Sequence, residues 1–289
     1  MWKLRSWVDP DQLNREYLAM NTHPAALALL EQDLENIDWG LLSSNPAAIH
    51  LLEQNPDKIS WDELSENPAA IHLLEQNPDR ICWYGLSRNP ATIHIMERNP
   101  DKINWDRLSR NPAAIGMLER HPDKIEWDWF SRNPAAIHLL EQNLDNIWWD
   151  WLSRNPAAIG ILERHPDKID WYWLSRNPAA IHLLEQNPEK INWYELSGNP
   201  CAGAVALLEK NLDKIHWFGL SGNPAAIGIL EHHPDKINWA MLSSNMAIFE
   251  YDYEGMLGSR KALHEELVAE RFHPRNLSRF TGWGFEVGW

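Results

Sequence analysis

The fold is decided by residues 45–66, which read Asn-Pro-Ala-Ala-Ile-His-Leu-Leu-Glu-Gln-Asn-Pro-Asp-Lys-Ile-Ser-Trp-Asp-Glu-Leu-Ser-Glu. This pattern returns along the chain, and its opening Asn-Pro recurs every 22 residues except for one step of 24. The pairs begin at Asn45, Asn67, Asn89, Asn111, Asn133, Asn155, Asn177, Asn199 and Asn223. A degenerate copy begins at His23, so ten copies cover residues 23–244. A fixed period of this length is typical of repeat architectures.

Each copy has positions 1 to 22, with the asparagine of the first Asn-Pro pair at position 1. Glu at position 9, Ile at position 15, Trp at position 17 and Ser at position 21 are the same in all ten copies. Asn followed by Pro is a favourable helix start, because the Asn side chain caps free backbone N–H groups and Pro has no N–H that would need a cap. A second Asn-Pro or His-Pro at positions 11 and 12 ends the first helix in most copies. Each copy therefore predicts an α-helix followed by a short α or 3-10 segment.

The apolar residues of a copy lie at positions 5, 7, 8, 15, 17 and 20. In residues 45–66 they are Ile49, Leu51, Leu52, Ile59, Trp61 and Leu64. One copy of 22 residues cannot enclose this set, but stacked copies can. The sequence predicts an all-α solenoid of ten two-helix repeats, an elongated body on the order of 100 Å long at helix spacings of roughly 8–10 Å. Because an aromatic of this size buries about 150–250 Å², we expect the position-17 tryptophans to be the largest contributor to the core.

The ends of the chain depart from the repeat, as terminal caps of a solenoid do. Residues 1–22 are predicted to form an N-terminal cap, and residues 245–289 a C-terminal helical cap and tail. The tail follows a longer amphipathic helix expected over residues 259–272. Between the caps, the 24-residue copy at 199–222 carries two extra residues within 201–206, which we expect to make a bulge or kink.

Composition limits the classes of partner. The chain has 289 residues with 41 acidic and 26 basic side chains, a net charge of −15, which argues against binding a nucleic-acid backbone. Cys82 and Cys201 lie in copies 3 and 9, too far apart in a solenoid for a disulfide. No apolar run approaches the roughly 20 residues of a membrane span, and the first residues lack the apolar region of a signal peptide. We expect a protein of an intracellular reducing compartment, without nucleic-acid or membrane partners.

The quoted repeat, with its Trp-x-x-Leu-Ser ending, resembles tandem repeats encoded by giant DNA viruses that infect amoebae. The stretch 249–253, then Glu265-Glu-Leu267 and His273-Pro274, is similar to the closing segment of those proteins. The resemblance covers roughly residues 23–280. It implies a viral protein in the cytoplasm of an infected cell or in the virion, and it implies no activity. More distantly, the unit is similar to leucine-rich repeat variants, in which α and 3-10 helices alternate in a superhelix.

The sequence offers no catalytic motif. No glycine-rich phosphate loop or nucleophile elbow is present, and His264-Glu265 is followed by Val268 where a zincin needs histidine. We therefore predict no enzyme, no cofactor and no metal site. The histidines do show a pattern: five copies have His at position 6 with Asn at position 11, and three have Gly at position 6 with His at position 11. We interpret this as one imidazole-sized space filled from either side, with metal ligation as the alternative.

The positions that vary between copies can carry recognition. In the central copies, positions 16, 18 and 19 become aromatic and position 22 becomes a row of arginines. Trp, Tyr and Arg are enriched at the energetic centres of protein interfaces. The candidate partner-binding residues are Trp129, Trp148, Trp151, Trp173, Tyr172, Tyr194, Arg110, Arg132, Arg154 and Arg176. The alternative is lateral packing between copies, with the arginines paired to carboxylates of positions 9 and 13.

The function predicted from these observations is a non-catalytic, monomeric scaffold that binds a host or viral protein or peptide. The alternative is a structural or self-assembling component of a virus particle, with Trp2, Trp7 and Trp289 as contact points. Replacing Trp148 and Trp151 by alanine is expected to weaken partner capture and to leave thermal unfolding nearly unchanged.

Overall fold

The computed structural model describes residues 2–35, 37–258 and 260–261. The chain divides into a large unit, Ser6–Ile248, and a small unit formed by Met1–Arg5 with Phe249–Trp289. Apart from residues 260 and 261, the predicted helix over 259–272 lies outside the described residues, as does the tail.

The small unit contains a short antiparallel sheet that the sequence did not predict. Strands β1 (Trp2–Leu4) and β2 (Phe249–Tyr251) pair with Trp2 opposite Tyr251, and these two rings stack with centroids 3.9 Å apart. Arg5 pairs with Glu250 at 3.5 Å. Strands of three residues are too short to show an alternating pattern, so only pairing with a distant segment reveals them.

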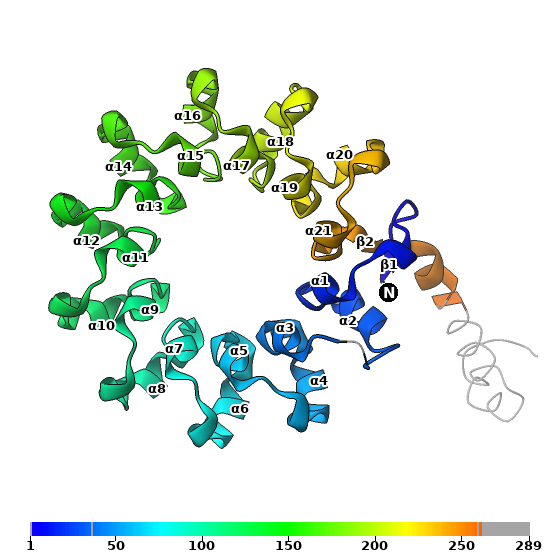
Figure 1. The fold of residues 1–289 in the computed structure, drawn as a ribbon, viewed down its shortest axis with the longest axis horizontal. Coiled ribbons are helices and arrows are strands. Elements are labelled where there is room, and N and C mark those ends of the chain that lie inside the picture. The colour runs from blue at the N-terminus through cyan, green and yellow to red at the C-terminus, as the bar shows by residue number, and fades with distance from the viewer. Residues whose placement is uncertain (1, 36, 259, 262–289) are drawn as a thin grey trace, which may run out of the picture. The chain divides into compact units, whose positions relative to one another are not determined.

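The large unit is a helical repeat, which confirms the predicted all-α solenoid. One set of short helices carries positions 17 to 21 and lies on the inner side of the array in Figure 1. These inner helices are α1 (Arg15–Ala19), α3 (Trp39–Ser44), α5 (Trp61–Glu66), α7 (Trp83–Leu86), α9 (Trp105–Ser109), α11 (Trp127–Ser131), α13 (Trp149–Ser153), α15 (Trp171–Leu174), α17 (Trp193–Ser197), α19 (Trp217–Ser221) and α21 (Trp239–Ser243).

The outer helices alternate with the inner ones and carry positions 5 to 10. They are α2 (Pro24–Leu30), α4 (Ile49–Gln54), α6 (Ile71–Gln76), α8 (Ile93–Glu97), α10 (Ile115–Arg120), α12 (Ile137–Gln142), α14 (Ile159–Arg164), α16 (Ile181–Gln186), α18 (Ala202–Glu209) and α20 (Ile227–His232). Where a copy starts with Asn-Pro, a 3-10 turn at positions 2 to 4 precedes most outer helices, as in Pro46–Ala48. Another 3-10 turn at positions 12 to 14, such as Pro56–Lys58, follows them.

The two ends of the large unit meet, so its repeats form a closed ring (Figure 1). Helix α1 packs against α21, and the backbone N–H of Asn14 donates to Ser243 Oγ at 2.8 Å. The side-chain amide of Asn21 donates to the carbonyls of Ser243 at 3.0 Å and Asn245 at 3.2 Å. The predicted elongated rod is therefore wrong, and residues 6–22 contact the last copy where a free terminal cap was expected.

A belt of buried asparagines runs through the ring and explains the Asn of position 1. Asn89 is typical: its amide donates to the carbonyls of Ser65 at 3.1 Å and Asn67 at 3.0 Å, at the junction of the two preceding copies, while its Oδ1 accepts the Ala91 N–H. Each such amide satisfies buried carbonyls that would otherwise lack partners. The asparagine belt within the described residues is Asn21, Asn45, Asn67, Asn89, Asn111, Asn133, Asn155, Asn177, Asn199, Asn223 and Asn245, all buried.

The invariant serines of position 21 form a second buried belt. Ser87 Oγ donates to the carbonyl of Trp83 in its own helix at 2.7 Å and accepts the backbone N–H of Asn104 from the next copy at 3.0 Å. The contact between Asn14 and Ser243 repeats this geometry across the closure. The closing interface therefore uses the same hydrogen bonds as the interfaces inside the array.

The apolar core is a double column of leucines at positions 8 and 20, and not the tryptophan column. In every copy these two side chains are fully buried, with Met96 or Phe130 replacing leucine, and position 4 is a buried alanine or threonine. The ten position-17 indoles are only half-buried. Their rings lie against the next copy, as Trp83 does under Lys102 Nζ at 4.8 Å. The tryptophans therefore lie at the edge of the core and outside its fully buried centre, because position 17 opens the inner helix.

The asparagine belt also corrects the register of the first copy. Asn21 Oδ1 accepts the N–H of His23, as position-1 asparagines do with the residue two places on. The first copy therefore begins at Asn21 and, like the copy at Asn199, has two extra residues before Asn45. In both, a longer outer helix, α2 or α18, absorbs them in place of a 3-10 turn and a shorter helix, so the expected bulge or kink does not form.

Candidate functional site

The variable positions of the central copies assemble a column that we call the Arg–Trp ladder, made of Arg110, Arg132, Arg154, Trp129, Trp151 and Trp173. Position 19 is the third residue of an inner helix, and position 22 is the residue that follows this helix. Each ladder arginine contacts the position-19 tryptophan of the next copy. The ring of Trp151 stacks on Trp129 with centroids 5.7 Å apart and on Trp173 at 5.5 Å. Interplanar angles of 27° and 25° make this a near-parallel stack.

The arginines cover the indoles of the following copy. The guanidinium carbon lies 5.6 Å from the Trp129 ring for Arg110, 5.2 Å from the Trp151 ring for Arg132 and 5.0 Å from the Trp173 ring for Arg154. These distances are typical of cation–π contacts. The tryptophans thus pack laterally between copies, as one interpretation of the sequence expected. The arginines contact indoles, however, and not the carboxylates of positions 9 and 13.

The ladder arginines lack acidic partners. Among the described residues, no carboxylate oxygen lies within 4.0 Å of the guanidinium nitrogens of Arg110, Arg132 or Arg154. Partial burial, reinforced by Arg110 and Arg154, lowers the pKa of Arg132 to about 10. Burial and neighbouring arginines also lower the pKa of Arg110 and of Arg154. The ladder is a row of like charges whose mutual repulsion an anion would relieve.

The two flanking arginines of the row differ, because each has a carboxylate. Arg88 pairs with Glu66 at 3.1 Å, and Arg176 pairs with Glu195 at 3.7 Å. The Glu195 side chain is only 7% exposed. Among the five arginines of position 22, Arg88 and Arg176 have direct carboxylate contacts, and the same two carboxylates act at longer range on Arg110 and Arg154.

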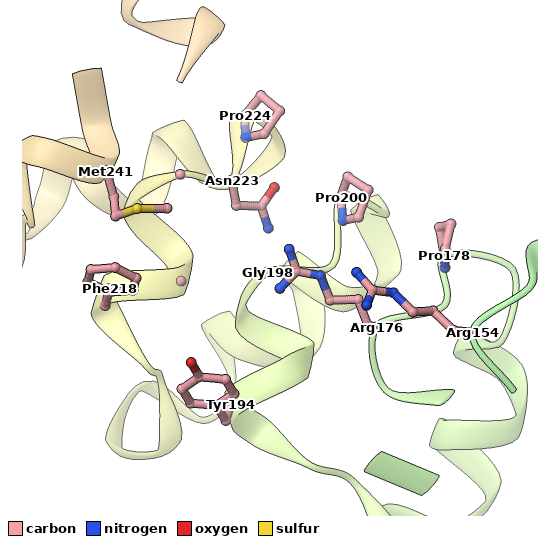
Figure 2. A pocket seen from close by; sticks show the side chains of 12 residues that line it. Arg154, Arg176, Pro178, Tyr194, Gly198, Pro200, Phe218, Asn223, Pro224 and Met241 are labelled. Atoms are coloured by element: carbon pink, nitrogen blue, oxygen red, sulfur yellow. The ribbon is translucent and has the colours of Figure 1, made fainter. Parts of the chain in front are cut away.

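A hollow of about 600 Å³ opens where the ladder ends. Figure 2 shows three proline rings on one side of it and Tyr194 with Phe218 on the other, with the side chains of Arg154 and Arg176 between. Positions 22 and 19, which build the ladder, are glycines here. The residues lining the hollow are Arg154, Arg176, Pro178, Tyr194, Gly198, Pro200, Phe218, Gly219, Gly222, Asn223, Pro224 and Met241.

The remaining candidate residues lie around the ladder to different extents. Tyr172 meets Trp173 edge-on at 4.9 Å, and its hydrogen bond to Glu195 raises the pKa of the phenol. Tyr194 lines the hollow. Trp148 is 56% exposed, and within the described chain its ring stacks on no other ring. It precedes α13 and is not part of the stack.

The histidine pattern has a different cause from the one expected. His138 Nε2 lies 2.9 Å from Glu119 Oε1 of the preceding copy. In two of the three copies with glycine at position 6, an arginine at position 10 takes over: Arg120 pairs with Glu97 at 2.9 Å and Arg164 with Glu141 at 2.5 Å. His at position 11 instead lies against the indole of the preceding copy, as His121 does edge-on to Trp105 with ring centroids 5.2 Å apart. One shared imidazole space is therefore wrong, and position 9 pairs with position 6 or 10 of the next copy.

Sequence reasoning missed the hollow, although Gly198, Gly219 and Gly222 were visible as breaks in the pattern at positions 22 and 19. Their meaning depends on knowing that these two positions meet across copies. The described residues hold no group of three or more His, Cys, Asp or Glu side chains placed to bind a metal ion. Each described helix falls short of the length and apolarity needed to span a bilayer. No protein-family model, curated protein or solved structure matches the chain.

Proposed function

We propose that the ring is a non-catalytic scaffold that binds a protein partner through the Arg–Trp ladder. The observation that carries this proposal is the row of three half-exposed guanidinium groups without a carboxylate partner. At several other places on the ring, charges pair between copies, as Arg120 does with Glu97. These three adjacent guanidinium groups form a positive strip in a chain of net charge −15, and the carboxylates of a partner would pair with it.

The geometry of the ladder supports strong binding for its size. Stacked rings fix one another, and each guanidinium is held over an indole, so little side-chain freedom is lost on association. Arg and Trp are also the residue types that dominate interface energetics. Trp148 extends the surface as an exposed side chain on the same copy as Trp151.

The resemblance of the copies to giant-virus repeats supports an infected cell, or the virion, as the setting of this scaffold. A structural role in the particle is the second candidate from the sequence. Such a role could use end-to-end growth of an open solenoid. This route has less support, because α1 and α21 pack against each other and leave no free end to the array.

The test is a comparison of two triple variants with equal charge change. In the first, Arg110, Arg132 and Arg154 become glutamine. In the control, the exposed outer-helix arginines Arg98, Arg120 and Arg164 become glutamine. Capture from cells producing the protein, read by quantitative mass spectrometry, should lose its partner with the ladder variant and keep it with the control. Equal recovery with both variants would refute a ladder-based function.

A further inference from the structure

The hollow lies beyond the end of the ladder, past the copy in which Glu195 follows Trp173 at position 19. Along position 19 the residues run Trp129, Trp151, Trp173, Glu195 and then Gly219. Along position 22, arginine gives way to glycine at residues 198 and 222. The Arg176 guanidinium lies at the place that a residue-198 side chain would take, so the open space is the one beside Gly219.

The backbone does not require a glycine at residue 219. A Cβ there would meet only ordinary contacts, the nearest being His216 Nδ1 at 3.6 Å. Gly219 lies inside α19, where glycine costs about 1 kcal/mol relative to alanine. Gly219 is therefore required neither by the backbone conformation nor by crowding, and it leaves open a space that a larger side chain at position 19 would fill.

The walls of this space suit a ligand that is both aromatic and anionic. Tyr194 and Phe218 supply aromatic surface, both about half exposed, and Met241 adds an apolar side chain. Arg154 brings a guanidinium without a carboxylate partner, and Arg132 and Arg110 continue the positive row away from the hollow. The volume of 600 Å³ falls in the range of roughly 300–1,000 Å³ found for ligand pockets.

Single-stranded nucleic acid combines aromatic rings with negative charge as well, but the ladder suits it poorly. Bases bind by stacking on free aromatic faces. The Trp151 faces are taken by Trp129 and Trp173 at 5.7 and 5.5 Å, and its ring also carries Arg132.

We propose that the ladder binds an extended acidic peptide segment, whose carboxylates contact Arg110, Arg132 and Arg154 and whose aromatic side chain enters the hollow beside Gly219. This inference rests on the proposed function and names the chemistry of its partner. Carboxylates pair with guanidinium groups in bidentate geometry, and the inserted ring replaces the missing rung.

The experiment uses fluorescein-labelled peptides and the full-length protein, with binding read by fluorescence anisotropy at low salt. The probes are a short Glu/Asp peptide with one central Phe, the same peptide with Ala for Phe, a Gln/Asn version that keeps Phe, and a single-stranded oligothymidylate. We expect the acidic Phe peptide to bind at least tenfold more tightly than each of the others. A Gln/Asn peptide that binds equally well, or an oligothymidylate that binds more tightly, overturns the acidic-peptide assignment.

The variant that tests the hollow is Gly219→Trp, which restores the rung. It should lower the affinity for the acidic Phe peptide about tenfold, to the value of the Ala peptide, and leave the Ala peptide unchanged. Gly160→Trp is the matched control, because residue 160 is an exposed position in α14, and no atom lies within 4 Å of the place that a Cβ would take there. Thermal unfolding of both variants verifies that they fold.

The outcomes separate the two proposals. If both acidic peptides bind equally and Gly219→Trp has no effect, the hollow is not used, while the ladder still binds acidic segments. If neither acidic peptide binds, but the ladder variant still loses its captured partner, the acidic-peptide inference fails and the scaffold function stands. If the ladder variant also retains the partner, both fail.

Discussion

The asparagine belt and the Arg–Trp ladder are both columns that run from copy to copy, yet they differ in every physical respect. The belt is buried, fully hydrogen-bonded and present in each copy. The ladder is half-exposed, confined to the central copies and left with unpaired charge. In a ring of nearly identical copies, the invariant positions close and stabilise the structure. The variable positions of a few copies are where a partner can bind.

The largest effect is expected from breaking the belt inside the array. Asn89→Ala removes the donor to the carbonyls of Ser65 and Asn67 and the cap on Ala91. Since each buried group left without a partner costs about 1–3 kcal/mol, the loss should be about 4 kcal/mol in urea unfolding. The control is Asn99→Ala at position 11, which has one bond, to Ile95, and should cost about 1 kcal/mol. Similar losses for the two variants would contradict the special role of the belt.

The closure can be tested with the same substitution at the end of the array. In a closed ring, Asn21→Ala removes bonds to Ser243 and Asn245 and should cost about 3 kcal/mol, close to the value for Asn89→Ala. In an open rod, Asn21 would lie at a free end, and only its cap on the His23 N–H would be lost, at a cost of about 1 kcal/mol. Urea unfolding of the two variants side by side distinguishes ring from rod.

Ladder substitutions should affect stability less than belt substitutions. Trp151→Ala removes two stacking contacts, each worth about 0.5–1.5 kcal/mol, so we expect a loss of about 2 kcal/mol. Trp148→Ala, at an exposed ring outside the stack, should cost less than about 0.5 kcal/mol. The sequence predicted that replacing Trp148 and Trp151 together leaves thermal unfolding nearly unchanged. The structure restricts this expectation to the replacement of Trp148. Calorimetric melting of the two single variants provides the measurement, and equal stability losses would contradict the stack.

The smallest effect is expected for the outer pairs. His138→Ala breaks an exposed contact with Glu119 whose side chains are 51% and 47% exposed. Exposed ion pairs contribute about 0–1 kcal/mol, and salt weakens them further. The loss should be below about 0.5 kcal/mol at physiological salt, measured by urea unfolding. A loss as large as that for Asn89→Ala would show that the outer pairs, too, hold the ring together.

Much of the candidate site could be predicted from the sequence, but its internal contacts could not. The arginines of position 22 and the tryptophans of position 19 were recognisable as the variable side chains of the central copies. That Arg132 covers Trp151 of the next copy, and that Trp148 stays outside the stack, depends on the offset between neighbouring copies. Gly198, Gly219 and Gly222 line one hollow because that offset brings positions 19 and 22 of neighbouring copies together.

The sequence by itself determined the repeat, its helices and their boundaries, because Asn-Pro caps and apolar spacing act within a few residues. Only the tertiary structure decided that the array closes and that leucines, rather than tryptophans, fill the core. Closure requires each of the eleven inner helices of the described chain to turn by about 33°, which is 360° divided by eleven. So small a rotation arises from packing between copies and leaves no mark in any single copy. Its consequence appears only when α1 reaches α21 and Asn21 meets the carbonyls of Ser243 and Asn245.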